Sequence, residues 1–330
     1  MKNNFNSKKI LVFTNDAGSS AYIASIISNE SKFFNWTVYV INNSPATKEL
    51  DKYNIPYNKF LLLNEVSEII KKKKPDIILY GTGWLNFNVI IKENSQKYNI
   101  KTIALIDHWD NYKRRFSKNV LPDAIIVMDD TAQKIALDTF NSEVDIFKIK
   151  NYYLQDISHS YSLKKNNKKD FVVFISEPTK VKKNPLDFSA VEYDLLTDIL
   201  RKFQKVIIRL HPTEPKNKYN KVTSSYPKSI IKVVKSSEED LATTLSKSKL
   251  TIGIGSTALY VSFLLGIKTI SYIPNRYKLS PITIPLPQKY SLTNLEDISS
   301  IDFSNAIREN VNSGALPFHQ MLNYFLRSAN

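Results

Sequence analysis

Polar side chains that could do chemistry follow the ends of several apolar segments in this 330-residue chain. The densest group is IDHWDNYKRRF, residues 106–116, where Asp107 and His108 come directly after an apolar run. Either side chain could act as a general base, because carboxylates and imidazoles can be tuned to accept protons near neutral pH. The same segment supplies three groups that could hold an anion or a sugar: Asn111, Arg114 and Arg115.

The loop NDAGSS, residues 15–20, follows the first apolar run of the chain. A serine within it could cap a following helix. Backbone N–H groups at Gly18 and Ser19 would suit an anion or a sugar hydroxyl, although a plain helix cap explains the pattern equally well. The loop lacks the GxGxxG pattern, so the sequence does not predict dinucleotide binding there.

A third loop of this half, GTGW, follows the apolar run DIILY. Two glycines around a threonine favour a binding floor lined by backbone, and the tryptophan behind them favours an aromatic platform. The predicted sugar-binding residues of this loop are Gly81, Thr82, Gly83 and Trp84. From these loops alone, Asp107 and His108 both stay open as the base.

The second half carries a histidine at the end of an apolar run. In RLHPTEP, residues 209–215, proline after His211 ends the expected strand, because proline has no N–H for a β-ladder. In GIGST, residues 253–257, two hydroxyl residues open an apolar helix, where amide N–H groups and the positive helix end could hold a phosphate. His211 would hold, and could protonate, a phosphate leaving group. The residues predicted to bind the phosphate-bearing substrate, the donor, are Glu177, Arg209, Pro212, Gly255, Ser256 and Thr257.

Strand and helix patterns alternate along nearly the whole chain, which predicts parallel sheets built from βαβ units. The polar stretch YSLKKNNKKD, residues 161–170, reads as a linker. We therefore predict an α/β protein with two Rossmann-like domains whose strand ends face a deep cleft. The predicted divisions are an acceptor domain at 1–165, a donor domain at 166–305 and C-terminal helices at 306–330 that could pack back on the first domain.

Composition limits the function classes. The net charge of +15 suits an anionic partner, such as a phosphate-bearing substrate or an acidic membrane surface, and cysteine is absent. Four histidines without an HExxH pattern favour no metal, and we expect no cofactor. The sequence shows no basic stripe with interleaved aromatic residues, so it does not predict a nucleic-acid-binding protein. Without a secretory signal or a long apolar run, we expect a cytoplasmic protein, with peripheral membrane contact as an option.

The order RLHP … EEDLATTLSKSKLTIGIGSTALYVSFLLGIKTI resembles the C-terminal half of bacterial GT-B glycosyltransferases that build capsule and lipopolysaccharide. Within them the chain looks most like HP-motif enzymes, the sialyltransferases and Kdo transferases that use CMP-activated acidic sugars. The resemblance implies that His211 contacts the donor phosphate and assists departure of CMP. It also implies that Ser256 and Thr257 bind the same phosphate, and that a carboxylate of the first domain, within a short acidic-Gly motif, is the base. Asp16, before Gly18, matches that motif, Asp107 is the rival, and His108 stays open.

One position departs from the common pattern. Many GT-B enzymes carry a glutamate that contacts the ribose about five residues after the hydroxyl pair begins, whereas this chain has Val261. We take this departure to favour a CMP donor over a UDP-sugar. The expected function is then metal-independent, inverting transfer of a nonulosonic acid (sialic, pseudaminic or legionaminic acid) or Kdo from CMP to a glycan or lipid-linked glycan.

Other functions stay open at this point. A CDP-glycerol glycerophosphotransferase shares a similar HP and hydroxyl pattern, and a UDP-sugar epimerase or hydrolase could use the same fold. A requirement for a glycan acceptor would separate a transferase from an epimerase. A scaffold without activity is disfavoured, because it would not need polar residues at so many strand ends.

Overall fold

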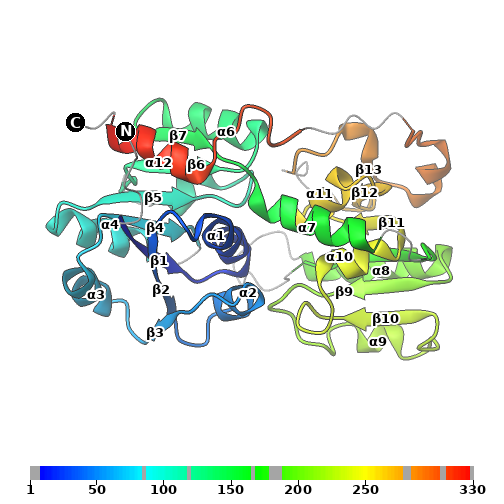
Figure 1. Ribbon diagram of the computed structural model, residues 1–330. Helices are drawn as coiled ribbons and strands as arrows, with labels where there is room; N and C mark the ends of the chain where they lie inside the picture. The colour runs from blue at the N-terminus through cyan, green and yellow to red at the C-terminus, as the bar shows by residue number, and fades with distance from the viewer. Residues whose placement is uncertain are drawn as a thin grey trace. The chain divides into compact units, whose positions relative to one another are not determined.

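The computed structural model describes residues 8–83, 87–116, 120–164, 168–177, 188–277, 284–304 and 310–327. By its internal contacts the chain divides into two compact units, coloured along the chain in Figure 1. Unit 1 comprises Met1–Tyr153 with Asn310–Asn330, and unit 2 comprises Leu154–Glu309. Helix α7, Tyr152–Leu163, spans the division, so the predicted linker at 161–170 begins inside a helix.

Unit 1 is a seven-stranded parallel sheet with the strand order β3-β2-β1-β4-β5-β6-β7. Its strands are β1 Lys9–Thr14, β2 Asn35–Ile41, β3 Asn58–Phe60, β4 Ile77–Gly81, β5 Lys101–Leu105, β6 Ala124–Val127 and β7 Asp145–Lys148. Its helices are α1 Ala17–Glu30, α2 Ala46–Lys52, α3 Glu65–Lys73, α4 Phe87–Lys97, α5 Tyr112–Arg115, α6 Asp130–Phe140 and α12 Phe318–Arg327. The central strands β1, β4 and β6 are largely apolar on both faces and buried except at Lys9, as a parallel sheet covered on both sides requires.

Unit 2 is a six-stranded parallel sheet with the order β10-β9-β8-β11-β12-β13. Its strands are β8 Phe171–Ile175, β9 Val206–Arg209, β10 Ile231–Val234, β11 Ser248–Gly253, β12 Thr269–Tyr272 and β13 Ser291–Leu292. The α-helices are α8 Phe188–Lys202, α9 Asn220–Thr223, α10 Leu241–Ser246 and α11 Thr257–Leu264, and two short 3₁₀ helices are η3 Gln288–Tyr290 and η4 Leu295–Ser300. Both units therefore have the Rossmann-like architecture that the alternating pattern predicts.

Three local elements differ from the sequence expectation. Helix α1 begins at Ala17 with Asp16 as its N-cap residue, so the serines of NDAGSS lie inside its first turn and do not cap it. Helix α2 and strand β3 are not predicted from the sequence. Strand β3 has only three residues, of which two are exposed, so it lacks an apolar periodic signal. None of the described helices has the length and apolar character needed to cross a bilayer.

The C-terminal helix α12 belongs to unit 1. The Phe318 side chain is fully buried, and its ring centroid lies 5.9 Å from that of Phe34 and 5.7 Å from that of Trp36. The backbone N–H of Lys150 also donates to the carbonyl oxygen of Leu316, just before this helix. The tail of the chain therefore completes the hydrophobic core of unit 1.

We expect Phe318→Ala to destabilise unit 1 by about 3 kcal/mol, because truncating a fully buried aromatic ring leaves a cavity. Tryptophan fluorescence during urea unfolding measures this effect, because all 3 tryptophans of the chain lie in unit 1. The exposed Gln320→Ala, in the same helix, serves as a control and should change stability little. Equal midpoints for the two variants would show that α12 does not contribute to the core.

Candidate functional site

The loops after β1 and β4 lie where the strand order of unit 1 reverses direction. Such a switch point is the usual ligand site of an open parallel sheet, because the connections leave a crevice there. Asp16 follows β1, and its side chain makes no cap bond to α1. A methyl group placed on Gly83 would lie only 2.1 Å from Oδ2 of Asp16, so this glycine lets the carboxylate sit against the β4 loop.

Asp107, after β5, is 4% exposed and reaches the first turn of α1. A methyl group on Gly18 would lie 2.0 Å from its Oδ2, so the glycine provides the space for the carboxylate. Oδ1 lies 3.9 Å from Nη1 of Arg115, and Oδ2 lies 3.7 Å from Nε2 of His108. Burial of a carboxylate is costly unless neighbours such as the Arg115 guanidinium compensate for its lost hydration.

Arg115 connects the β4 and β5 loops. Its Nη1 donates to Oγ1 of Thr82 at 3.2 Å, and its own side chain is 3% exposed. Ser19 and Gly81 are also buried, and a methyl group on Gly81 would lie 2.5 Å from Oγ of Ser19. These residues position the loops from inside the unit, whereas the sequence predicts them as groups that hold the sugar or an anion.

The segment after Asp107 is held by two buried hydrogen-bonded residues that the sequence analysis did not identify. Nε1 of Trp109 donates to the carboxylate of Asp129 at 2.9 Å, and Asp129 also caps α6 by accepting from the N–H of Ala132. The Tyr112 hydroxyl donates to the carbonyl oxygen of His108 at 2.7 Å. This loop is therefore fixed, and His108 is left partly exposed at its surface.

The other predicted residues of unit 1 are placed less closely. Asn111 adopts a left-handed backbone conformation with φ 58°, and its Oδ1 accepts from Nη1 of Arg114 at 3.5 Å. Arg114 is exposed and Arg115 is buried, so the two arginines do not act as one clamp. Trp84 lies outside the described residues.

Unit 2 repeats the arrangement at its own switch point, between β8 and β11. Glu177 follows the last residue of β8 by two positions, as Asp16 follows the last residue of β1. Its Oε1 accepts from the backbone N–H of Gly255 at 2.6 Å, in the loop after β11. An acidic side chain therefore meets a glycine across the switch point in both units.

Ser256 and Thr257 lie at the start of α11, as the GIGST pattern predicts. Ser256 is the N-cap residue, and its Oγ accepts from the N–H of Leu259 at 3.3 Å. Thr257 is the first residue of the helix, and both residues are partly exposed. The positive end of the helix thus lies beside the Glu177 contact.

His211 lies after β9, and its ring contacts Thr213. Its Nδ1 accepts from the backbone N–H of Thr213 at 3.3 Å and lies 2.8 Å from the Oγ1 of that threonine. Because Nδ1 accepts, the neutral ring carries its proton on Nε2. The partly exposed Pro212 follows in the turn. The neutral imidazole is thus a donor at Nε2, as stabilisation of a phosphate oxygen requires.

Arg209, predicted to bind the donor, is buried within unit 2. Its Nη1 donates to the carbonyl oxygen of Glu239 at 2.9 Å and to Oγ1 of Thr244 at 2.8 Å. These bonds direct the guanidinium toward the start of α10. Its predicted role at the phosphate has no support in these contacts.

A buried ionic cluster lies under the β8 and β9 loops, and the sequence does not predict it. Nζ of Lys218 lies 2.6 Å from Oε2 of Glu192 and 2.5 Å from Oε1 of Glu214. Burial raises the pKa of Glu192 to about 8, although the ammonium of Lys218 lowers it in part. Glu214 lies in the segment RLHPTEP, four residues before Lys218, but α8 supplies Glu192 without any local sequence signal.

Solved structures share this fold along almost the whole chain. UDP-GlcNAc 2-epimerase of Methanocaldococcus jannaschii, in complex with UDP-GlcNAc and UDP, matches with a TM-score of 0.69 and 14% identity over 96% of this chain and 99% of its own. S. aureus MnaA, solved with UDP, matches with a TM-score of 0.68 and 12% identity over 97% of each chain. Both matches cover unit 1 and unit 2. The chain has the GT-B fold.

A third GT-B neighbour is the UDP-GlcNAc 2-epimerase of Neisseria meningitidis, bound to UDP-GlcNAc. Its TM-score is 0.65, with 12% identity over 96% of this chain and 92% of its own. No protein-family model matches the chain, and no curated protein matches its sequence. The identities are low, so these similarities establish the GT-B fold and not the activity.

The comparisons contradict the predicted CMP-dependent transferase. The GT-B neighbours named above are UDP-GlcNAc 2-epimerases or a protein solved with UDP, which agrees better with the alternative of a UDP-sugar epimerase. The reason for the error lies at Val261. This residue is 2% exposed inside α11, so its apolar character reflects packing and does not discriminate between nucleotides.

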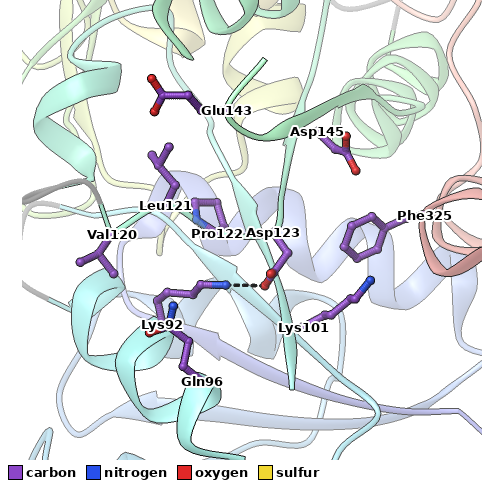
Figure 2. A pocket seen from close by; sticks show the side chains of 10 residues that line it. All are labelled: Lys92, Gln96, Lys101, Val120, Leu121, Pro122, Asp123, Glu143, Asp145 and Phe325. Carbon is purple, nitrogen blue, oxygen red and sulfur yellow. Dashed lines mark hydrogen bonds and ion pairs between the residues drawn. The ribbon is translucent and has the colours of Figure 1, made fainter. Parts of the chain in front are cut away.

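A cavity of about 630 Å³ lies elsewhere in unit 1, at the end of the sheet where strands β5 and β7 begin (Figure 2). Lys101 and Asp145, the first residues of β5 and β7, line it, and the ion pair between Lys92 and Asp123 crosses its wall at 2.6 Å. Its lining includes three carboxylates, those of Asp123, Glu143 and Asp145. These would repel a diphosphate, so we do not assign the nucleotide to this cavity.

Proposed function

We propose that the protein is a UDP-sugar 2-epimerase that acts on a UDP-N-acetylhexosamine, or a hydrolase of the same substrate class. The observation that carries the proposal is the similarity over 96–97% of the chain to proteins solved with UDP or UDP-GlcNAc. Two of those proteins are bound to UDP-GlcNAc and one to UDP, and groups of this chain suit a nucleotide sugar.

The loops of unit 2 supply groups suited to a diphosphate. The start of α11 offers backbone N–H groups and the positive end of the helix, with Ser256 and Thr257 beside them. His211 adds an Nε2 donor, which would stabilise negative charge on the departing diphosphate. Glu177 is the acidic exception, and a nucleotide at Gly255 would have to replace its carboxylate.

Asp16 and Asp107, the acidic cluster of unit 1, supply groups suited to the reaction at the sugar. Inversion at C2 requires that the C2 proton leaves and that a proton returns on the other face. Loss of the proton together with breakage of the C1–O bond to UDP leaves a C1=C2 double bond, and UDP must add back to C1 as the new C2–H bond forms. A carboxylate is an appropriate base for this step. We assign the role to Asp107, because Arg115 and His108 flank its carboxylate, and Asp16 is the second candidate.

Proton NMR of UDP-GlcNAc incubated with the protein in D₂O tests the proposal. An epimerase would convert part of it to the 2-epimer and place deuterium at C2 of both nucleotide sugars. Free UDP with a released sugar would identify a hydrolase instead. An unchanged spectrum, together with no binding of UDP in calorimetry, would reject the UDP-sugar assignment.

We expect Gly18→Ala to lower turnover at least tenfold while leaving the protein folded. The added methyl group would lie 2.0 Å from Oδ2 of Asp107, so the carboxylate must move, whereas alanine favours the helix itself. Gly83→Ala is the matched variant, because its methyl group would displace Asp16 in the same way, at 2.1 Å. Initial rates of epimerisation distinguish the two carboxylates: a larger loss in Gly83→Ala would assign the base to Asp16.

A further inference from the structure

The ammonium of Lys218 connects two loops of unit 2 that carry proposed nucleotide-binding residues. Besides its two glutamate partners, Nζ donates to the carbonyl oxygen of Glu177 at 2.8 Å and to Oγ of Ser176 at 3.2 Å. Ser176 and Glu177 follow β8, and Glu214 belongs to the turn after β9. The side chain of Lys218 is 6% exposed, so these contacts replace its hydration.

The glutamate partners extend the cluster to the site residues. Oε2 of Glu214 accepts from the backbone N–H of His211 at 2.8 Å. Oε1 of Glu192 accepts from the backbone N–H of Glu177 at 2.6 Å. The carboxylate of Glu177 in turn accepts from the N–H of Gly255 at 2.6 Å. A continuous series of hydrogen bonds therefore runs from the histidine loop to the loop before α11.

Stability alone does not explain this cluster. Buried ion pairs are often no more stabilising than apolar groups of the same volume, because both charges lose their hydration. Their best-attested use is to fix one arrangement among several. Here the fixed parts are the ends of β8 and β9, where a shift of 1 Å would move His211 relative to Gly255.

We propose that Lys218 is a positioning residue for nucleotide binding. It holds the His211 turn and the Glu177–Gly255 contact in fixed positions relative to each other. The inference rests on the proposed function for its ligand, UDP, but its structural part does not. Lys218 itself does not contact the nucleotide. It acts through Glu214 on one side and through the backbone and side chain of Glu177 on the other.

The test compares Lys218→Met with Lys202→Met in the full chain. Lys202 also forms an ion pair at 2.6 Å, with Glu296, but on the surface of unit 2. Calorimetry with UDP should show a dissociation constant raised at least tenfold in Lys218→Met and changed less than twofold in Lys202→Met. A variant that merely folded less well would bind fewer molecules of UDP with the same dissociation constant.

Hydrogen exchange of the free protein provides a readout without the ligand. The amides of His211, Glu177 and Gly255 should lose protection at least tenfold in Lys218→Met, relative to amides within β8. Lost protection in a protein that binds no UDP would support the positioning role and reject the proposed function. Unchanged protection and an unchanged dissociation constant would overturn the positioning role.

A second variant covers the case in which Lys218→Met does not fold, because it leaves two buried carboxylates without their cation. Glu214→Gln keeps the shape and leaves Lys218 paired with Glu192, but its amide can accept only through one oxygen. It should raise the dissociation constant for UDP about threefold to tenfold. No change of affinity in this variant would also overturn the proposal.

Discussion

Asp107→Asn should lower the rate of epimerisation about a thousandfold, while the dissociation constant for UDP changes little. Asparagine keeps the shape of the side chain but cannot remove a proton, and loss of a general base typically costs a factor of 10² to 10⁴. UDP lacks the sugar, so its affinity reports on the nucleotide groups, which we assign to unit 2. Initial rates by NMR and calorimetry with UDP measure the two quantities on the same preparation.

Asp16→Asn is the matched control, because both aspartates follow strands of the unit 1 sheet, Asp16 after β1 and Asp107 after β5. We expect a loss of no more than about tenfold, since Asp16 lies against the Gly83 loop, whereas Arg115 and His108 flank the carboxylate of Asp107. The reverse order of the two losses would make Asp16 the base. A thousandfold loss of UDP affinity in Asp107→Asn would instead show that this variant disturbs the fold.

The alternating strand and helix pattern predicted the two parallel sheets because buried parallel strands read as continuous apolar runs. The segments KKILVFT, DIILYG and KTIALID correspond to β1, β4 and β5, whose ends carry the acidic cluster. Strand order was not visible in the sequence, so the contacts between Asp107 and Gly18 and between Asp16 and Gly83 could not be predicted. They depend on the strand order, which brings the loops after β1, β4 and β5 to the same end of the sheet.

The residue types were informative at loops and misleading where side chains turn inward. The sequence predicts both Asp107 and Arg115 as site residues. Only the structure shows that both side chains are buried and that the guanidinium of Arg115 lies beside the carboxylate of Asp107. Arg209 was assigned to a phosphate from its position beside His211, whereas it donates to groups near the start of α10. The Lys218 cluster joins residues 26 positions apart on different elements, and no local pattern marks such a pair.

Glu192→Gln should make unit 2 more stable than the wild type at pH 9, with little difference at pH 5. Burial raises the pKa of Glu192 from 4.5 to about 8 in the folded protein, so folding takes up a proton between these values. The groups that face it are Lys218, Glu214 and the backbone N–H of Glu177. One ammonium between two carboxylates is balanced when one carboxylate holds a proton.

The sign follows from linkage. Between pH 4.5 and about 8 the folded state binds more protons at Glu192 than the unfolded state, so the free energy of unfolding falls as pH rises. The fall is at most about 1.4 kcal/mol per pH unit and ends above the folded pKa. Glutamine resembles the protonated acid at every pH, and its variant should lack this fall.

Urea unfolding from pH 5 to 9 measures the effect by far-UV circular dichroism, with tryptophan fluorescence reporting unit 1 separately. Asp194→Asn, also in α8, is the control, because hydrogen bonds from Tyr277 and Arg276 lower the pKa of Asp194. Its contribution is present at neutral pH and is lost only as pH falls through that lowered pKa, so the variant should keep the wild-type slope. Parallel curves for wild type and Glu192→Gln would show that Glu192 is ionised throughout. Lys218 would then balance two buried negative charges, and the cluster would stay under the same strain at every pH tested.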